Sequence, residues 1–261
     1  MKIMLDLNKI YCGDCLDLMK SIPDKSIDLV VTDMPYGRTK NKWDNTPDLD
    51  ALFSLLWRVS RLNTAVICTS QQPFTTDLIN SQRKFFRYDL IWFKKGKATG
   101  FLNANKMPLR SHENILVFYQ QLPVYHPQKT KGDTNHSKGS HSRGQKQTNN
   151  NYGKFDQTFQ SPPTTDKFPL SVLEFQGVHP PIHPTQKPVE LLQYLIETYS
   201  NENTVILDPF CGSGTTCVAA KLLGRNYIGI DISPEYCKIA EARLRNTEEN
   251  LFKGVPNARP E

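Results

Sequence analysis

Two short turns in this chain hold residue types that bind ligands and carry out chemistry. The first, Asp33 to Tyr36, reads Asp-Met-Pro-Tyr and follows the apolar run Ile27–Thr32. The second, Asp208–Thr216, contains an acid, a phenylalanine and two glycines, and it follows the apolar run Val205–Leu207. Short β-branched runs of this kind predict buried strands. Since ligands bind beyond the carboxyl ends of parallel strands, we expect both turns to face one cleft.

The residues of the glycine turn narrow the class of ligand. A phosphate-binding loop needs a lysine after its last glycine, whereas Thr215 follows Gly214. A dinucleotide-binding turn needs a third glycine for close packing, and Cys217 stands at that position. The acid Asp208 suits a cationic ligand group better than an anionic one. Nucleoside triphosphates and dinucleotides are therefore disfavoured.

The glycine turn resembles a motif of one enzyme family. Phe210, Gly212 and Gly214, with Asp208 upstream, are similar to the Phe-x-Gly-x-Gly motif of S-adenosylmethionine-dependent DNA amino-methyltransferases. In that family this turn holds the methionine part of the cofactor, which carries a sulfonium and an amino group. The resemblance therefore implies S-adenosylmethionine as the cofactor and makes these four residues cofactor-binding.

The first turn resembles the Asp/Asn/Ser-Pro-Pro-Tyr motif of the same enzymes. Asp33, Pro35 and Tyr36 match it, and Met34 replaces its first proline while keeping the backbone carbonyl that the family uses. The resemblance implies that Asp33 and this carbonyl accept hydrogen bonds from an exocyclic amine whose lone pair is delocalised. Tyr36 would stack on a base extruded from the duplex. All four residues, Met34 included, are thus expected in the catalytic turn, and the methyl group passes in line to the nitrogen.

Three further residues are expected at the cofactor. Asp231 ends the next predicted strand, 23 residues after Asp208, close to the spacing of about 20 for an acid that binds ribose hydroxyls. Asp14 resembles the adenine-side acid of the family, and Lys187 lies in His183–Pro188, which resembles the entrance to the cofactor pocket. For Asp14 and Asp231 a helix cap is the alternative, and Lys187 is otherwise an exposed lysine.

The target base follows from Asp33. In this family an acid at that position favours N6 of adenine, whereas Ser-Pro-Pro-Tyr usually accompanies N4 of cytosine, which is the main alternative. A cytosine C5 enzyme needs a Pro-Cys nucleophile, and the chain contains no Pro-Cys pair. Because of Met34, a non-catalytic DNA-binding subunit is a second alternative. A methyltransferase for RNA or protein glutamine is a third, although those families usually place the glycine motif first.

Composition and charge indicate the partners. The net charge is +6, and Arg83–Arg110 contains eight lysines or arginines with Asp89 as its one acid, which predicts a DNA-contacting surface. Apolar runs are far shorter than the roughly 20 residues that span a bilayer, so we expect no membrane segment and a cytoplasmic protein. We expect reduced cysteines and no metal site. A homodimer and a cognate restriction enzyme are partners that the sequence leaves open.

The elements around these turns predict an α/β fold. The order, with the catalytic turn first, then a polar stretch, then the glycine turn, resembles the circularly permuted β class of amino-methyltransferases. That class has a seven-stranded, mostly parallel, Rossmann-like sheet. We divide the chain into a catalytic half (1–120), a polar insertion for target recognition (121–179), a cofactor-binding half (180–246) and a tail (247–261). The predicted strands cover 27–32, 65–69, 90–93, 115–119, 205–207 and 227–232, and the predicted helices cover 49–62, 188–196, 215–223 and 235–244.

Overall fold

The computed structural model describes residues 5–37, 46–133, 164–178 and 186–253. The start of the predicted pocket-entrance motif, 183–185, and most of the polar insertion lie outside these described residues. The chain forms two compact units, one of Met1–His126 with Ser171–Glu261 and one of Pro127–Leu170. Both predicted turns belong to the first unit.

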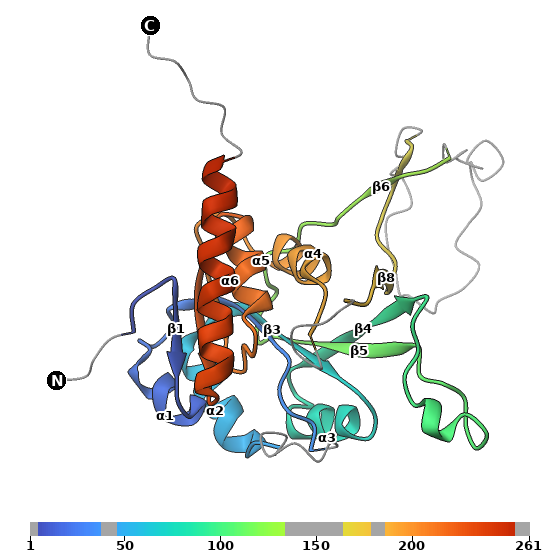
Figure 1. Ribbon diagram of the computed structural model, residues 1–261, viewed down its shortest axis with the longest axis horizontal. Helices are drawn as coiled ribbons and strands as arrows, with labels where there is room; N and C mark the ends of the chain where they lie inside the picture. Colours follow the sequence, from blue (N-terminus) through green and yellow to red (C-terminus); the bar gives the residue numbers. More distant parts are fainter. Residues whose placement is uncertain (1–4, 38–45, 134–163, 179–185, 254–261) are drawn as a thin grey trace, which may run out of the picture. The chain divides into compact units, whose positions relative to one another are not determined.

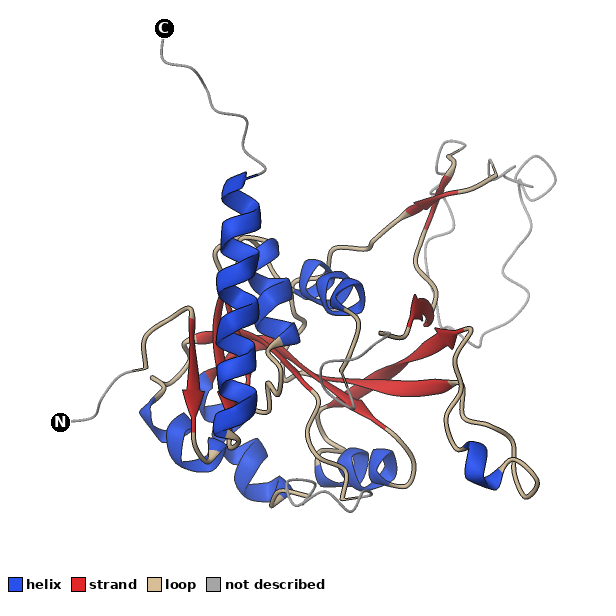
Figure 2. Ribbon diagram, viewed as in Figure 1, coloured by secondary structure: helices blue, strands red, loops and turns tan. Residues whose placement is uncertain are grey.

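The first unit is built on one sheet with the strand order β1-β10-β9-β2-β3-β5-β4-β8 (Figures 1 and 2). The strands are β1 (Lys9–Cys12), β2 (Ile27–Thr32), β3 (Ser60–Ser70), β4 (Phe86–Lys95), β5 (His112–Phe118), β8 (Val172–Gln176), β9 (Val205–Asp208) and β10 (Asn226–Asp231). Among the strands of the described residues, β5 alone runs antiparallel to its neighbours in this sheet, β3 and β4. The mostly parallel α/β sheet confirms the predicted fold class.

The predicted count of seven strands is wrong, because the sheet has eight. Strand β8 falls inside the predicted insertion 121–179, yet it pairs in parallel with β4 at the edge of the sheet. Its sequence, Val-Leu-Glu-Phe-Gln, lacks the continuous apolar run from which the inner strands are predicted, and only Leu173 of its five residues is buried. The compact second unit is correspondingly shorter than the predicted insertion. Within it, β6 (Thr130–Lys131) and β7 (Asp166–Lys167) pair antiparallel.

The permuted order brings the two halves of the chain together in the middle of the sheet. Strand β9, from the C-terminal half, pairs in parallel with β2, so that Leu29 aligns with Ile206 and Val30 with Leu207. The predicted catalytic turn follows β2 and the glycine turn follows β9. Both turns therefore leave the sheet at the carboxyl ends of neighbouring strands.

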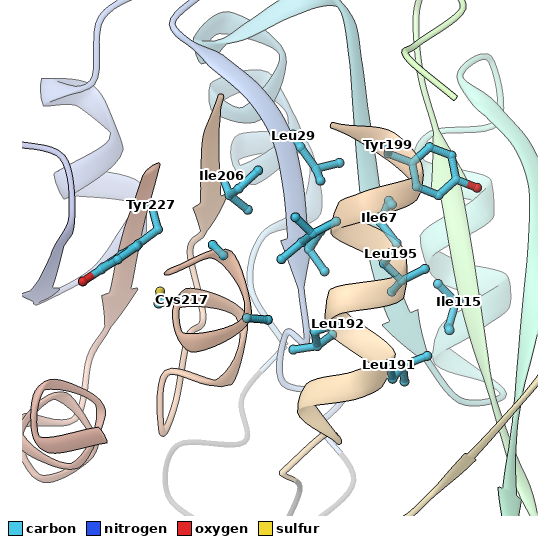
Figure 3. Close-up of a cluster of buried hydrophobic side chains, with 14 of the residues drawn as sticks. Leu29, Ile67, Ile115, Leu191, Leu192, Leu195, Tyr199, Ile206, Cys217 and Tyr227 are labelled. Carbon is cyan, nitrogen blue, oxygen red and sulfur yellow. The ribbon is translucent and has the colours of Figure 1, made fainter. Parts of the chain in front are cut away.

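Helices cover both faces of the sheet. They are α1 (Cys15–Leu18), α2 (Leu49–Val59), α3 (Phe74–Ser81), α4 (Val189–Tyr199), α5 (Thr215–Leu222) and α6 (Pro234–Lys253), with short 3-10 turns η1 (Met19–Ser21) and η2 (Phe101–Asn103). Leu29 and Val31 of β2 pack in one core with α4 and α5, and Figure 3 shows Leu191 and Leu195 of α4 in it. Val30 packs in the other core, with α2 and α3. This alternation is expected for a strand that is buried on both sides.

Several element boundaries differ from the predictions. Helix α2 ends at Val59 because β3 begins at Ser60, and α6 continues to Lys253, well beyond its predicted end. Helix α3 is not among the predicted elements, since only Phe74, Thr75 and Leu78 of its eight residues are buried. Across the described residues, no helix combines the length and apolarity needed to span a bilayer.

Candidate active site

A cavity of about 370 Å³ lies at the carboxyl ends of β1, β2, β9 and β10. This volume is within the range of small-molecule sites. Predicted site residues from both halves of the chain line it: Asp14, Asp33, Pro35, Lys187, Asp208, Phe210, Gly212 and Asp231. The fold thus brings the catalytic turn and the glycine turn to one cavity, as the strand order predicts.

Residues of helix α6 that do not line the cavity hold the glycine turn in place. Gly214 has a φ of +78°, and a Cβ atom added to it would lie 2.7 Å from the Cβ of Ala240 in α6. Arg243, also in α6, donates hydrogen bonds to the Ser213 carbonyl (2.7 Å) and to the Thr215 hydroxyl (3.0 Å). Arg243 is not among the predicted site residues, because nothing in the turn itself points to a partner so far along the chain. These contacts hold the turn in shape independently of a ligand.

The close packing of helix and strand that a third glycine would provide comes from another residue. Gly229 in β10 faces the helix that follows the turn, and a Cβ atom there would lie 2.7 Å from the sulfur of Cys217. Cys217 in helix α5 and Gly229 in the neighbouring strand therefore complement each other. The described cysteines are all free thiols.

Asp208 is a buried carboxyl group, and its burial disfavours the ionised form. Its side chain accepts a hydrogen bond from the Phe210 amide (3.1 Å). Burial raises the pKa of Asp208 to about 7, and hydrogen bonds, the one from the Thr216 hydroxyl first, oppose this shift. No lysine, arginine or histidine of the described residues forms an ion pair with it. A cationic ligand group in the cavity would supply the missing counter-charge.

Asp14 makes the helix cap that was its alternative interpretation, whereas Asp231 accepts hydrogen bonds from backbone amides outside the helices. Asp14 is the N-cap of α1 and accepts from the Leu16 amide at 2.7 Å. Asp231 accepts from the amides of Gly212 and Ser233, both at 2.8 Å, so it also holds the glycine turn against β10. Both side chains nevertheless line the cavity. Capping and ligand binding are compatible here, because a carboxylate has about four acceptor sites.

The carboxylate of Asp33 is held by three donors. Tyr36 donates to Oδ1 at 2.6 Å, the Thr69 hydroxyl donates to the same oxygen, and Lys187 approaches Oδ2 at 2.5 Å. The Tyr36 ring stacks on Phe74, with ring centroids 5.3 Å apart. Burial, with Asp33 nearby, raises the pKa of Tyr36, so its hydroxyl stays a donor. Thr69, at the end of β3, is a site residue that sequence reasoning missed.

Met34 differs from its neighbours in the turn. Its side chain is only 1% exposed and packs in the core beneath α2, so it does not line the cavity. A proline at this position would leave part of that core space empty. The substitution therefore exchanges rigidity in the turn for apolar packing under it.

Lys187 lies at the cavity but contacts the catalytic turn. Its ammonium group is 3.3 Å from Oε2 of Glu113 as well as 2.5 Å from Asp33, and Lys94 pairs with Glu113 in turn. Burial alone would lower the pKa of Lys187, but the two carboxylates outweigh it and raise the pKa. Burial likewise opposes ionisation of Glu113, but Lys187 and Lys94 outweigh it and lower its pKa. Sequence reasoning missed Glu113 because it precedes the apolar run from which the strand is predicted.

The fold and the site together define an S-adenosylmethionine-dependent methyltransferase. A family model described as a DNA methylase, of the N6/N4 class, matches residues 27–242. Type II methyltransferase M.BglII of Bacillus subtilis is 30% identical over 285 residues, covering 97% of this chain and 74% of the relative. M.HinfI of Haemophilus influenzae is 30% identical over 270 residues, covering 94% and 70%. The chain belongs to the N6/N4 DNA methylase family, and S-adenosylmethionine is its cofactor.

Solved structures show the same fold. The cytosine-N4-specific PvuII DNA methyltransferase aligns with a TM-score of 0.65 and 17% identity, covering 97% of this chain and 95% of that one. The M1.HpyAVI complex with S-adenosylmethionine aligns with a TM-score of 0.60 and 22% identity, covering 90% and 98%. At these identities the likeness supports the fold, and the target base has to be inferred from the site.

Proposed function

We propose that this protein methylates N6 of adenine in DNA. The observation that carries the proposal is the position of Asp33, an acid rather than a serine, at the cavity that it shares with Asp208. N4 of cytosine is the second candidate, because the same turn geometry presents a hydrogen-bond acceptor to either exocyclic amine. Membership of the N6/N4 DNA methylase family does not decide between the two bases, because the family includes both reactions.

The cavity residues fit the cofactor. When bound, S-adenosylmethionine supplies a methyl group on a sulfonium. We assign the methionine part to Asp208, Phe210, Gly212 and Gly214, since the buried carboxylate suits a cation, Gly212 lines the cavity, and Gly214 shapes the turn against α6. Asp231 would hold the ribose hydroxyls through its remaining acceptor sites, and Asp14 would lie on the adenine side.

On the acceptor side, Asp33 and the Met34 carbonyl would accept hydrogen bonds from the target amine and return electron density to its nitrogen. Oδ1 of Asp33 already accepts from two hydroxyls. An incoming amine can replace one of them, and Tyr36 is the candidate to leave because its ring would then stack on the extruded base. Pro35, which lies between Met34 and Tyr36, keeps the turn rigid.

We also propose which segments contact DNA, where the protein is located and which partners it has. The basic segment Arg83–Arg110 would neutralise phosphates, and the insertion between the two halves would read bases in the grooves. A cytoplasmic location, a homodimer and a paired restriction enzyme are predictions of the same kind. A non-catalytic DNA-binding subunit is the opposing hypothesis.

Methyl transfer from tritiated cofactor to DNA of mixed sequence tests the proposal. We expect the wild type to label DNA, Asp33→Ala to lose labelling while it still binds cofactor, and Asp231→Ala to bind cofactor more weakly. A fully active Asp33→Ala variant would overturn the catalytic assignment. Specific DNA binding without any transfer would favour the non-catalytic subunit.

A further inference from the structure

We infer that Glu113 and Lys94 are positioning residues for Asp33 and act on it through Lys187. This inference rests on the proposed function, because it concerns the same acceptor site. It adds two residues that lie outside both sequence motifs, one on β5 and one on β4.

The four side chains form a line of alternating charge. Asp33 is followed by Lys187 at 2.5 Å, Lys187 by Glu113 at 3.3 Å, and Glu113 by Lys94 in direct contact. Within this line, every charged group therefore lies next to a group of opposite charge. The line joins the turn after β2 to the segment before α4 and to the β4–β5 pair.

Burial makes this arrangement sensitive to any missing member. The side chains of Lys187 and Glu113 are each 6% exposed and that of Lys94 is 11% exposed. Charges so far from water have to be compensated by their neighbours, and removing one partner leaves an uncompensated charge. Glu113 thus pairs with the same ammonium that contacts Asp33, and it limits where that ammonium can place the Asp33 carboxylate.

Lys94 orients Glu113 in the same way. Its ammonium contacts the carboxylate of Glu113 and lies 4.9 Å from the centre of the Trp92 ring. Its backbone amide donates to the Ser111 carbonyl at 2.8 Å, which ties its strand to the start of β5. The far end of the line is therefore anchored in the sheet.

The residues of the charged line differ in whether they reach the cavity. Among the described residues, Lys187 and Asp33 line the cavity, whereas Glu113 and Lys94 do not. The contact of Glu113 with the catalytic turn runs through Lys187, which pairs with both Glu113 and Asp33. Substitutions of either residue should change the rate of transfer far more than the affinity for the cofactor.

A double-mutant cycle tests this dependence. We expect Glu113→Gln and Lys187→Met each to lower kcat about 10- to 100-fold, because each removes a buried charge from the line that holds Asp33. Cofactor Kd should change less than about threefold in Glu113→Gln, whose side chain does not line the cavity. The double variant should be no slower than Lys187→Met alone, because Lys187 is the residue through which Glu113 contacts Asp33. Lys187→Arg should recover part of the activity, since it keeps the charge.

The matched control is Asp24→Asn, which also converts a carboxylate to an amide. Asp24 pairs with Arg58, but its side chain is 71% exposed and lies away from the cavity. Its kcat should stay within about twofold of the wild type, as for most exposed ion pairs. Thermal melting and cofactor binding verify that each variant is folded. If Glu113→Gln does not fold, Lys94→Met takes its place in the cycle with the same expectations.

The outcomes separate the two claims. A wild type that methylates no DNA contradicts the proposed function, and this inference falls with it. An active wild type with a Glu113→Gln variant of unchanged kcat overturns the inference alone. Multiplicative losses in the double variant also overturn it, because they would show that Glu113 acts independently of Lys187.

Discussion

The ammonium of Lys187 lies 2.5 Å from the carboxylate of Asp33, although 154 residues separate the two in the sequence. One residue comes from the catalytic half of the permuted chain and the other from the start of the cofactor-binding half. The contact joins these halves at the point where we propose the target amine to bind. It also keeps one oxygen of Asp33 occupied and leaves the other to hydroxyl donors, which can be exchanged.

That exchange predicts unequal roles for the ring and the hydroxyl of Tyr36. In Tyr36→Phe the ring can still stack on Phe74 and on a base, and Asp33 keeps Thr69 and Lys187. We expect kcat/KM within about threefold of the wild type, since the target amine is proposed to displace this hydroxyl. Tyr36→Ala should lower kcat/KM about 10- to 100-fold through lost base stacking. Equal losses in both variants would show that the hydroxyl itself is required.

Cofactor affinity should depend on pH through Asp208, whose pKa burial raises to about 7. A cationic ligand binds the ionised carboxylate, which is the minor form below that pH. We therefore expect the Kd for S-adenosylmethionine to fall at least about tenfold between pH 5 and pH 7. Titration calorimetry at several pH values measures this directly. A Kd that stays constant over the range would place the cation elsewhere.

The same group affects stability in the opposite direction. The pKa of Asp208 is higher in the folded protein than the value of about 3.9 in an unfolded chain, so the folded state binds the proton more tightly. The contribution of Asp208 to the free energy of unfolding should then decrease as pH rises from about 4 to about 7. In Asp208→Asn this decrease should vanish while cofactor binding weakens. Denaturant unfolding of the ligand-free proteins verifies the sign.

Gly214 is predicted to be intolerant of any side chain. An added methyl group would meet Ala240 at 2.7 Å on a backbone with φ of +78°. Gly214→Ala should lower the free energy of unfolding by about 1–3 kcal/mol and weaken cofactor binding. Gly224→Ala is the matched control, because Gly224 has φ of +69° but open space around its Cβ. It should show only the backbone cost of about 1–2 kcal/mol, with normal cofactor binding.

Met34 should matter more for stability than for chemistry. Its side chain is 1% exposed in the core, while its backbone carbonyl is the group proposed to meet the amine. Met34→Ala should destabilise the protein by about 2–5 kcal/mol, and Met34→Leu by less than about 1.5 kcal/mol. Both should transfer methyl groups at permissive temperature. A Met34→Leu variant that is stable but inactive would mean that the methionine side chain itself takes part.

The parts of the fold that the sequence predicts are those with a strong local signal. β-branched runs such as Ile27–Thr32 predict buried strands, and glycines after Asp208 predict a ligand turn. The edge strand Val172–Gln176 escapes prediction, because pairing with β4 rather than its own pattern makes it a strand. Glu113 and Arg243 escape for a related reason, since their roles depend on partners that only the folded chain brings close.

The most direct test of the central claim is the identity of the methylated nucleoside. DNA from cells that express the wild type or Asp33→Ala is digested to nucleosides, and the products are identified by mass spectrometry. We predict N6-methyladenine from the wild type and none above background from Asp33→Ala. N4-methylcytosine in place of N6-methyladenine would contradict the adenine assignment, and no methylated nucleoside at all would contradict the enzyme.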